Sequence, residues 1–212
     1  MRRKCKVDCR WSPELAYVVG LFASDGNLSS DGRHLNITSK EREVVETVRT
    51  LLRLENKIGT KARGGSQRKE YFVLQFGDKN FYEFLLSIGL TPAKSKTIGY
   101  IAIPELYFPD FFRGCIDGDG SIDSFMHPET RLPQIRLRLC SASQIFITCM
   151  LEQARNCFNV AGGSIYVNKK TGMQILSFGK RDALKIFKSM YYADTVPALS
   201  RKRNAALTYM GE

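Results

Sequence analysis

The sequence predicts an α+β fold of two pseudo-symmetric halves, each with a four-stranded antiparallel sheet and helices on one face. Two internal similarities predict it. The segment Val19–Gly26 resembles Arg113–Gly120 at an offset of 94 residues, and the Phe-Gly pair at 76–77 recurs at 178–179, an offset of 102 residues. Both halves show the same order of helical and strand patterns, αββαββα, so we interpret the chain as a duplicated unit.

Caps and hydrophobic spacing predict the elements of the first half. Ser12 and Pro13 begin a helix that runs to about Ser24 and stops at Gly26. The stretch that follows is a hairpin, because Ser-Asp-Gly at 30–32 interrupts it. Helical and alternating patterns then predict a helix over 40–54, strands near 58–63 and 71–77, and a helix over about 80–88.

The second half repeats this order with eight more residues, which fit a longer loop at 126–131. Its predicted elements are helices over 108–118, 143–158, 180–192 and 197–209, and strands over 121–126, 134–140, 163–167 and 173–178. We expect two domains, residues 1–98 and residues 99–212, joined at the two repeated helices.

Positive charge is concentrated near the two ends of the sequence. Lys and Arg number 32 against 21 Asp and Glu, a net charge of +11, of which +4 falls in residues 1–10 and +5 in residues 180–203. Clustered positive charge favours a polyanionic partner, most simply nucleic acid. A solubilising surface explains the composition equally well.

Composition excludes several classes of protein. With 43% hydrophobic residues, the chain can bury a full core and is not a disordered protein. No run approaches the roughly 20 apolar residues that span a bilayer, and no apolar core follows the basic N-terminus. We therefore expect a cytoplasmic or organelle-matrix protein that is not secreted and has no membrane partner. The six cysteines are interpreted as reduced thiols, since the Cys5/Cys9 pair has no partner pair at zinc-finger spacing.

The outward faces of the predicted strands carry hydrogen-bonding side chains that suit base edges and phosphates. A two-stranded ribbon fits the major groove of DNA, although an ordinary half-solvated sheet shows the same pattern in a single strand. The duplicated sheet and the positive charge favour DNA. The candidate contacts are His34, Asn36, Thr38, Lys61, Arg63, Tyr71 and Gln75 in the first half, and Gln134, Arg136, Arg138, Ser164, Tyr166, Asn168 and Ser177 in the second.

Two carboxylates end the repeated helices. Asp25 and Asp119 both lie at a helix C-terminus, where the helix dipole disfavours negative charge by about 0.3–1 kcal/mol. Gly20 and Gly114 lie midway along the same helices, where Gly costs roughly 1 kcal/mol relative to Ala, and close helix packing explains them. If the helices pack together, the acids approach each other and a hard divalent cation such as Mg²⁺ would neutralise them.

At these residues the sequence resembles a known family. Val18–Gly26 and Phe112–Gly120 are similar to the two motifs of the LAGLIDADG homing endonucleases. The first motif is the more divergent, with Ala23 where an acid is frequent, while the eighth position is Asp in both. The resemblance covers essentially the whole chain. It implies a monomeric pseudo-dimer that binds a long asymmetric duplex DNA site and hydrolyses both strands with divalent metal ions.

The resemblance also implies roles for individual residues. Asp25 and Asp119 would bind Mg²⁺, or Mn²⁺ or Ca²⁺, with the backbone carbonyls of Ser24 and Gly118. The helices around Gly20 and Gly114 would form the interface between halves. Ser39 and Ser141 match polar positions that help to arrange active-site water. Lys94 and Lys202 match basic residues near the scissile phosphates, although Lys96 and Arg201 align almost as well.

Three functions remain open at this point. The leading one is a metal-dependent, site-specific DNA endonuclease. The first alternative is a maturase that binds intron RNA on the same fold, and nothing in the sequence separates the two. The second is a DNA-binding regulator without cleavage, which the presence of both acids disfavours.

Overall fold

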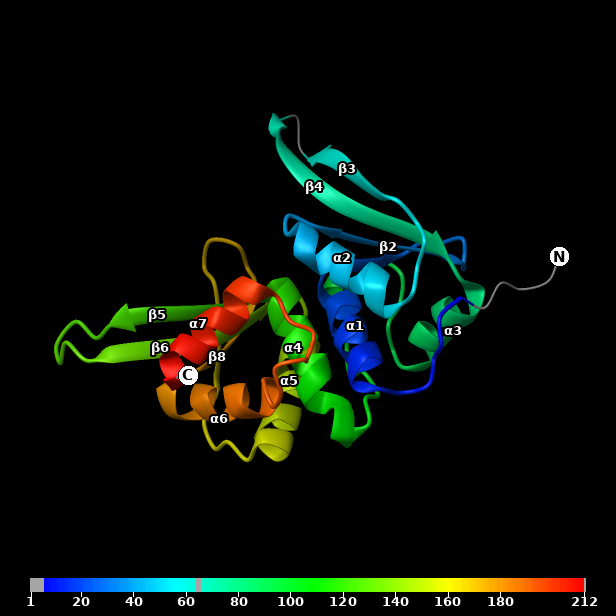
Figure 1. Cartoon of the computed structure of the whole chain (residues 1–212). Helices are drawn as coiled ribbons and strands as arrows, with labels where there is room; N and C mark the ends of the chain where they lie inside the picture. The colour runs from blue at the N-terminus through cyan, green and yellow to red at the C-terminus, as the bar shows by residue number, and fades with distance from the viewer. Residues whose placement is uncertain (1–5, 64–65, 212) are drawn as a thin grey trace.

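The computed structural model describes residues 6–63 and 66–211, with the backbone alone at residues 63 and 66–70. Two halves lie side by side, each with one four-stranded antiparallel sheet (Figure 1). The first half has the strand order β1-β2-β4-β3. Its elements are α1 (Pro13–Ser24), β1 (Gly26–Leu28), β2 (His34–Ser39), α2 (Arg42–Leu51), β3 (Ile58–Arg63), β4 (Ser66–Gly77) and α3 (Lys79–Ser87).

The second half has the equivalent strand order, β5-β6-β8-β7. Short 3₁₀ turns, η1 (Lys94–Lys96) and η2 (Glu105–Tyr107), join it to the first half. Its elements are α4 (Phe108–Asp119), β5 (Gly120–Met126), β6 (Pro133–Ser141), α5 (Gln144–Phe158), β7 (Ser164–Val167), β8 (Gln174–Phe178), α6 (Lys180–Met190) and α7 (Ser200–Met210). The predicted fold class is confirmed. The domain boundary at 98–99 stays a prediction, and it falls between η1 and η2.

Three element boundaries differ from the predicted ones by three residues or more. Helix α2 ends at Leu51 rather than near 54, because Arg53 adopts a left-handed conformation with φ of 52°. Strand β4 begins at Ser66, five residues earlier than predicted, and extends the β3–β4 ribbon beyond the rest of its sheet (Figure 1). Helix α7 begins at Ser200 rather than at 197, where Pro197 instead offers its carbonyl to a buried arginine.

Helices α1 and α4 pack against each other at the centre of the molecule (Figure 1). The two repeated glycines touch at this crossing. A Cβ built on Gly20 would lie 2.9 Å from the Cα of Gly114 and would overlap the carbonyl oxygen of Phe111. A Cβ on Gly114 would likewise overlap the carbonyl oxygen of Tyr17. The two backbones therefore approach to a distance that only glycine allows.

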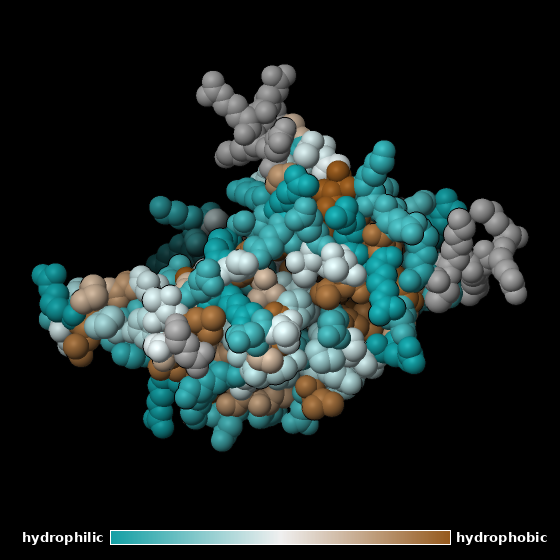
Figure 2. Space-filling view, viewed as in Figure 1, coloured by the Kyte–Doolittle hydropathy of each residue, from teal (hydrophilic) through white to brown (hydrophobic). Residues whose placement is uncertain are grey.

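Each half has its own aromatic core next to this crossing. In the first half Phe22 makes edge contacts with Phe76 and Phe81. In the second half Phe112 makes edge contacts with Phe158 and Phe178. Hydrophilic side chains cover much of the surface in Figure 2, with apolar ones scattered among them. Among the described helices, none has the length and apolar content needed to cross a membrane.

The α1–α4 crossing leads to a stability prediction. We expect Gly20→Ala to lower the free energy of unfolding by roughly 3 kcal/mol, because the new methyl group meets backbone that cannot move aside. Urea denaturation measures the change. The matched control is Gly59→Ala, since a Cβ on Gly59 enters open space. Equal stability of the two variants would contradict the close crossing.

Candidate functional site

The C-terminal ends of α1 and α4 bring Asp25 and Asp119 into one region. Asp25 caps α1, its backbone N–H donating to Leu21 at 2.9 Å, and Asp119 is the last residue of α4. A Cβ on Gly118 would overlap the hydroxyl of Ser24 and lie 3.6 Å from Oδ2 of Asp25. The carboxylate of Asp25 therefore lies next to the C-terminal end of α4, in the other half.

Lys94 is buried in the first half beside these acids. Its side chain is 6% exposed, and its ammonium donates to the carbonyl oxygen of Gly26. Burial lowers the pKa of Lys94, while the charges of Asp119 and Asp25 act against that shift. Lys94 and Asp25 line a cavity of about 490 Å³ together with residues of β1, β2 and β3.

Lys202 is buried at the equivalent place in the second half. It lies in the first turn of α7, is 3% exposed, and donates to the carbonyl oxygens of Ile116 at 2.5 Å and Asp117 at 2.8 Å. Burial lowers the pKa of Lys202 to about 8, against the charges of Asp117, Asp25 and Asp119. The residues that align almost as well, Lys96 and Arg201, are exposed.

The two acids and two lysines form one electrostatic unit. Desolvation raises the pKa of Asp119, although its side chain reaches solvent, and Lys94 and Lys202 counteract the rise. The donor chemistry fits a hard divalent cation, since carboxylates lie beside the backbone carbonyls of two helix ends. Within the described residues no three His, Cys, Asp or Glu side chains group together. Carbonyls, water or phosphate would therefore complete the coordination of an ion.

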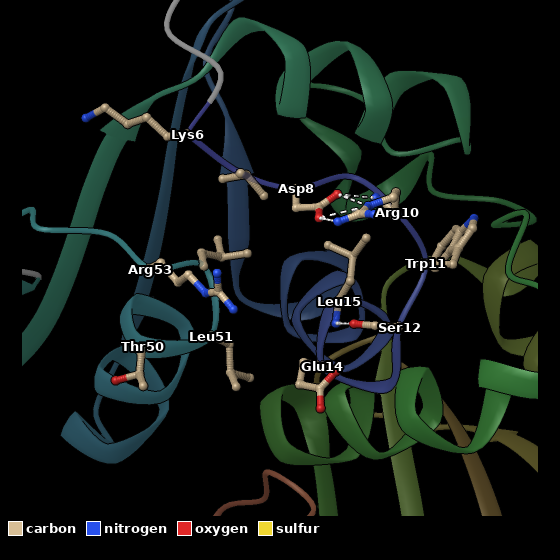
Figure 3. A pocket seen from close by; sticks show the side chains of 12 residues that line it. Lys6, Asp8, Arg10, Trp11, Ser12, Glu14, Leu15, Thr50, Leu51 and Arg53 are labelled. Carbon is tan, nitrogen blue, oxygen red and sulfur yellow. Dashed lines mark hydrogen bonds and ion pairs between the residues drawn. The ribbon is translucent and has the colours of Figure 1, made fainter.

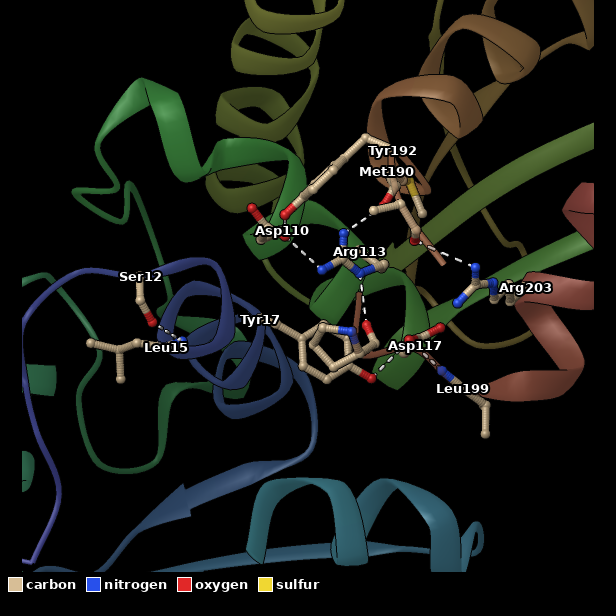
Figure 4. Close-up of polar contacts among 12 residues, drawn as sticks. Ser12, Leu15, Tyr17, Asp110, Arg113, Asp117, Met190, Tyr192, Leu199 and Arg203 are labelled. Carbon is tan, nitrogen blue, oxygen red and sulfur yellow. Dashed lines mark hydrogen bonds and ion pairs between the residues drawn. The ribbon is translucent and has the colours of Figure 1, made fainter. Parts of the chain in front are cut away.

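Asp117 is a buried acid that sequence reasoning did not single out (Figure 4). Its Oδ2 accepts hydrogen bonds from the hydroxyl of Tyr17 at 2.9 Å and from the backbone N–H of Leu199 at 2.8 Å. Its Oδ1 is buried without a hydrogen-bond partner. Burial raises the pKa of Asp117 to about 6. This side chain joins α1, α4 and the start of α7.

Arg113 is a second buried residue whose structural role the sequence reasoning missed (Figure 4). It is fully buried and pairs with Asp110 at 2.6 Å. It also donates to the carbonyl oxygens of Met190 at 2.5 Å and Pro197 at 2.8 Å. These bonds attach the segment between α6 and α7 to α4. A signal was present, because two opposite charges stand three residues apart inside an apolar helix.

Ser39 and Ser141 hold the turns between strand and helix. The hydroxyl of Ser39 accepts from the backbone N–H of Glu41 at 3.2 Å, and that of Ser141 from Ser143 at 3.1 Å. Both are 8% exposed. These contacts are structural, and a role in arranging water stays a prediction.

The open face of the first sheet carries the polar residues expected there. The partly exposed residues His34, Asn36 and Thr38 alternate with buried ones along β2. Register aligns Asn36 with Gln75, and Lys61 with Tyr71. The ring of His34 is hydrogen-bonded to Asp31 in the hairpin turn. The side chain of Arg63 lies outside the described residues.

The open face of the second sheet differs in charge from the predicted one. Gln134, Arg136 and Arg138 alternate with buried residues, as expected. Asp123 lies opposite Arg136 on the same face, and its Oδ2 accepts from Nε of Arg138 at 3.1 Å. Phe125 is also on this face, under the guanidinium of Arg136 at 4.9 Å. The sequence argument missed both Asp123 and Phe125.

Strands β7 and β8 of this sheet carry three of the remaining candidates. Ser164 pairs in register with Ser177, and Tyr166 is exposed. Asn168 lies in the turn after β7, where its Oδ1 accepts from the backbone N–H of Lys170 at 3.0 Å, and its contact with DNA stays a prediction. The side chain stabilises the turn because the strand ends at Val167.

A separate cavity lies at the opposite end of α1, far along the helix from the acids (Figure 3). It measures about 720 Å³ and is bordered by the N-terminal segment, the start of α1 and the end of α2. Asp8 and Arg10 pair with each other here. Of the basic N-terminal cluster, residues 1–5, with Cys5, lie outside the described part, and Cys9 is a free thiol.

Residues 12–89 match the family model of a LAGLIDADG-like domain. The part of the chain that is similar to this family is therefore the first half. No curated protein sequence matches the chain. The matched residues contain α1, and α4, which packs against it, is the corresponding helix of the second half.

Solved structures extend the LAGLIDADG fold over both halves. Full-length DUF199/WhiA from Thermatoga maritima is 14% identical, with a TM-score of 0.57 over 93% of this chain, which spans 61% of that protein. The homing endonuclease I-WcaI, bound to its DNA recognition sequence, is 13% identical, with a TM-score of 0.61 over 93% of this chain and 89% of that one. A variant of I-DmoI, in complex with its target DNA in the presence of Mg, is 16% identical, with a TM-score of 0.56 over 85% and 97%. At these identities the likeness concerns the fold, and the resemblance indicated by the two motifs is confirmed.

The shifted pKa of Lys202 leads to a prediction about pH. The unfolded chain holds the Lys202 proton up to a pKa near 10.5, whereas the folded chain releases it near 8. The penalty for burying the charge is complete below pH 8 and is relieved as pH rises to 10.5. Relative to Lys202→Met, the wild-type protein should therefore gain about 3 kcal/mol of unfolding free energy across that interval. Chemical denaturation at several pH values measures it, and a constant difference would contradict the burial of a charged amine.

Proposed function

We propose that this protein is a site-specific endonuclease that binds a long asymmetric duplex and hydrolyses both DNA strands with divalent metal ions. The observation that carries the proposal is the burial of two lysines beside two carboxylates. Lys94 is 6% exposed and Lys202 is 3% exposed, and both feel the charges of Asp25 and Asp119.

A protein that only bound DNA would gain nothing from this arrangement. Burying an ammonium group costs several kcal/mol, and binding to the DNA backbone away from a reacting phosphate is ordinarily provided by exposed lysines and arginines. Paired carboxylates would also repel the phosphate backbone unless cations neutralised them. Lysines and acids held together at the junction of two sheets suit chemistry on a phosphodiester.

The open sheet faces support duplex DNA as the partner. Polar side chains alternate along β2 and β6, and the β3–β4 and β5–β6 ribbons extend away from the α1–α4 helix pair (Figure 1). Ribbons of this kind fit the major groove, where side chains read base edges. The same faces offer Lys61 and Arg136 for phosphates.

The residues of this chain have two roles in the proposed reaction, metal binding and charge stabilisation. Asp25 and Asp119 would hold Mg²⁺, or Mn²⁺ or Ca²⁺, with the carbonyls of Ser24 and Gly118. When bound, the metal supplies a more acidic water and charge stabilisation at the leaving oxygen. With a pKa near 8, Lys202 is an ammonium group at neutral pH. It and Lys94 stabilise the negative charge that develops on the phosphate during attack.

The central test removes one acid at a time. We expect Asp25→Asn and Asp119→Asn each to slow cleavage of the cognate duplex by about 100-fold or more while DNA binding survives. The target comes from selection in a randomised duplex library. Asp8→Asn is the matched control, because Asp8 is exposed and pairs with the neighbouring Arg10, away from the proposed site. Cleavage at the wild-type rate by both acid variants would refute the proposed site.

The salt dependence of the binding affinity, measured for duplex DNA and for structured RNA, tests which nucleic acid the protein binds. We expect binding to duplex DNA to weaken steeply as salt rises, because lysines and arginines displace counterions from phosphates. Arg136→Ala should weaken binding and reduce the slope by about 1 if Arg136 contacts a phosphate. Tighter binding to structured intron RNA than to any duplex would instead identify a maturase.

A further inference from the structure

The N-terminus of α7 is held by carboxylates from two other elements. The backbone N–H of Leu199 donates to Asp117 of α4 at 2.8 Å, and that of Ser200 donates to Oε1 of Glu43 at 3.1 Å. Helix N-termini leave unpaired N–H groups and favour negative charge. The N-cap residue, Leu199, has no side-chain acceptor, so both acceptors come from elsewhere.

Glu43 belongs to α2, in the opposite half of the molecule. The hydroxyl of Ser200 also donates to the same Oε1. A second bond between the halves lies beside it, from Nε of Arg201 to Oε1 of Glu41 at 2.8 Å. The start of α2 in the first half is therefore hydrogen-bonded to the start of α7 in the second half. The bonded residues of α7, Ser200 and Arg201, directly precede Lys202.

The two lysines are held differently. Lys94 lies on the three-residue turn η1, whose N-cap, Ala93, is left-handed with φ of 54° and provides no side-chain cap. The acceptor of its ammonium, Gly26, belongs to its own half. Lys202 lies on an 11-residue helix whose first turn depends on contacts with both halves. The pseudo-symmetry of the site thus breaks at the elements that carry the lysines.

We propose that Glu43 is a positioning residue that sets the place of Lys202 from the opposite half of the molecule. Its effect on strand cleavage rests on the proposed function, because it assumes that Lys202 serves one of the two strands. Loss of Glu43 lets the first turn of α7 move, and a displacement of about 1 Å can slow a reaction by 10²-fold. The strand served by Lys94 is unaffected.

Strand-specific cleavage tests this role in the full-length protein. The two strands of the cognate duplex carry different labels, and their cleavage rates are measured separately with Mg²⁺. We expect Glu43→Ala to slow one strand by about tenfold or more, so that nicked DNA accumulates, and Lys202→Met to slow the same strand. Glu43→Gln, which keeps an acceptor for the Ser200 N–H, should restore part of the rate. Glu46→Ala is the control, since Glu46 pairs with Arg42 on α2 itself.

A second readout does not depend on nuclease activity. Mass spectrometry follows the acylation of each lysine by an amine-reactive reagent in the free protein. Lys202 should react faster in Glu43→Ala than in the wild-type protein, while Lys94 and the Glu46→Ala control remain unchanged. Unchanged acylation of Lys202 together with equal slowing of both strands would overturn the positioning role.

The two proposals fail in distinguishable ways. A wild-type protein that cuts no duplex, with faster acylation of Lys202 in Glu43→Ala, refutes the endonuclease and keeps the positioning role. A wild-type protein that cuts both strands, with no strand bias and no change in acylation in Glu43→Ala, keeps the endonuclease and refutes the positioning role.

Discussion

The glycine contact between α1 and α4 is the constraint on which the rest of the structure depends. A close crossing at Gly20 and Gly114 brings two helix C-termini together, and each ends in an aspartate. Two helix dipoles and two carboxylates concentrate negative potential there. Buried ammonium groups, and an ion when present, offset it. Strands β1 and β5 follow directly after α1 and α4, so the crossing also positions the two sheets. It therefore fixes both the geometry of the site and the spacing of the β3–β4 and β5–β6 ribbons.

Buried charge also makes the two halves unequal. Asp110 and Arg113 pair inside α4, and Arg113 and Asp117 attach the segment before α7 to this helix. At the corresponding positions of α1, 94 residues earlier, stand three small or apolar residues, Ala16, Val19 and Ala23. Breaking such a network leaves an unpaired buried charge, which costs about 3–5 kcal/mol. In the second half, buried hydrogen bonds thus hold the segment that precedes Lys202 against α4. The corresponding residues of α1 offer no such charged groups to the segment around Lys94.

Repetition made the fold predictable, because two copies of one pattern confirm each other's helices and strands. The acids and glycines followed from the same repeat, and the lysines from the family resemblance. Residues without a repeat partner were missed. Asp117 looks like part of a motif until the structure joins it to Leu199, 82 residues away. Asp123 was missed because strand alternation identifies a face of the sheet but not the ion pair on it.

The central claim is that the helix crossing makes one joint site from two carboxylates. Titration of Mn²⁺ into the wild-type protein, Asp25→Asn, Asp119→Asn and the double variant, followed by calorimetry, tests it directly. Joint ligation predicts that each single variant loses nearly all the affinity that the double variant loses, so the effects are far from additive. Additive losses, or full affinity in either single variant, would show that the two acids act independently and would contradict the account.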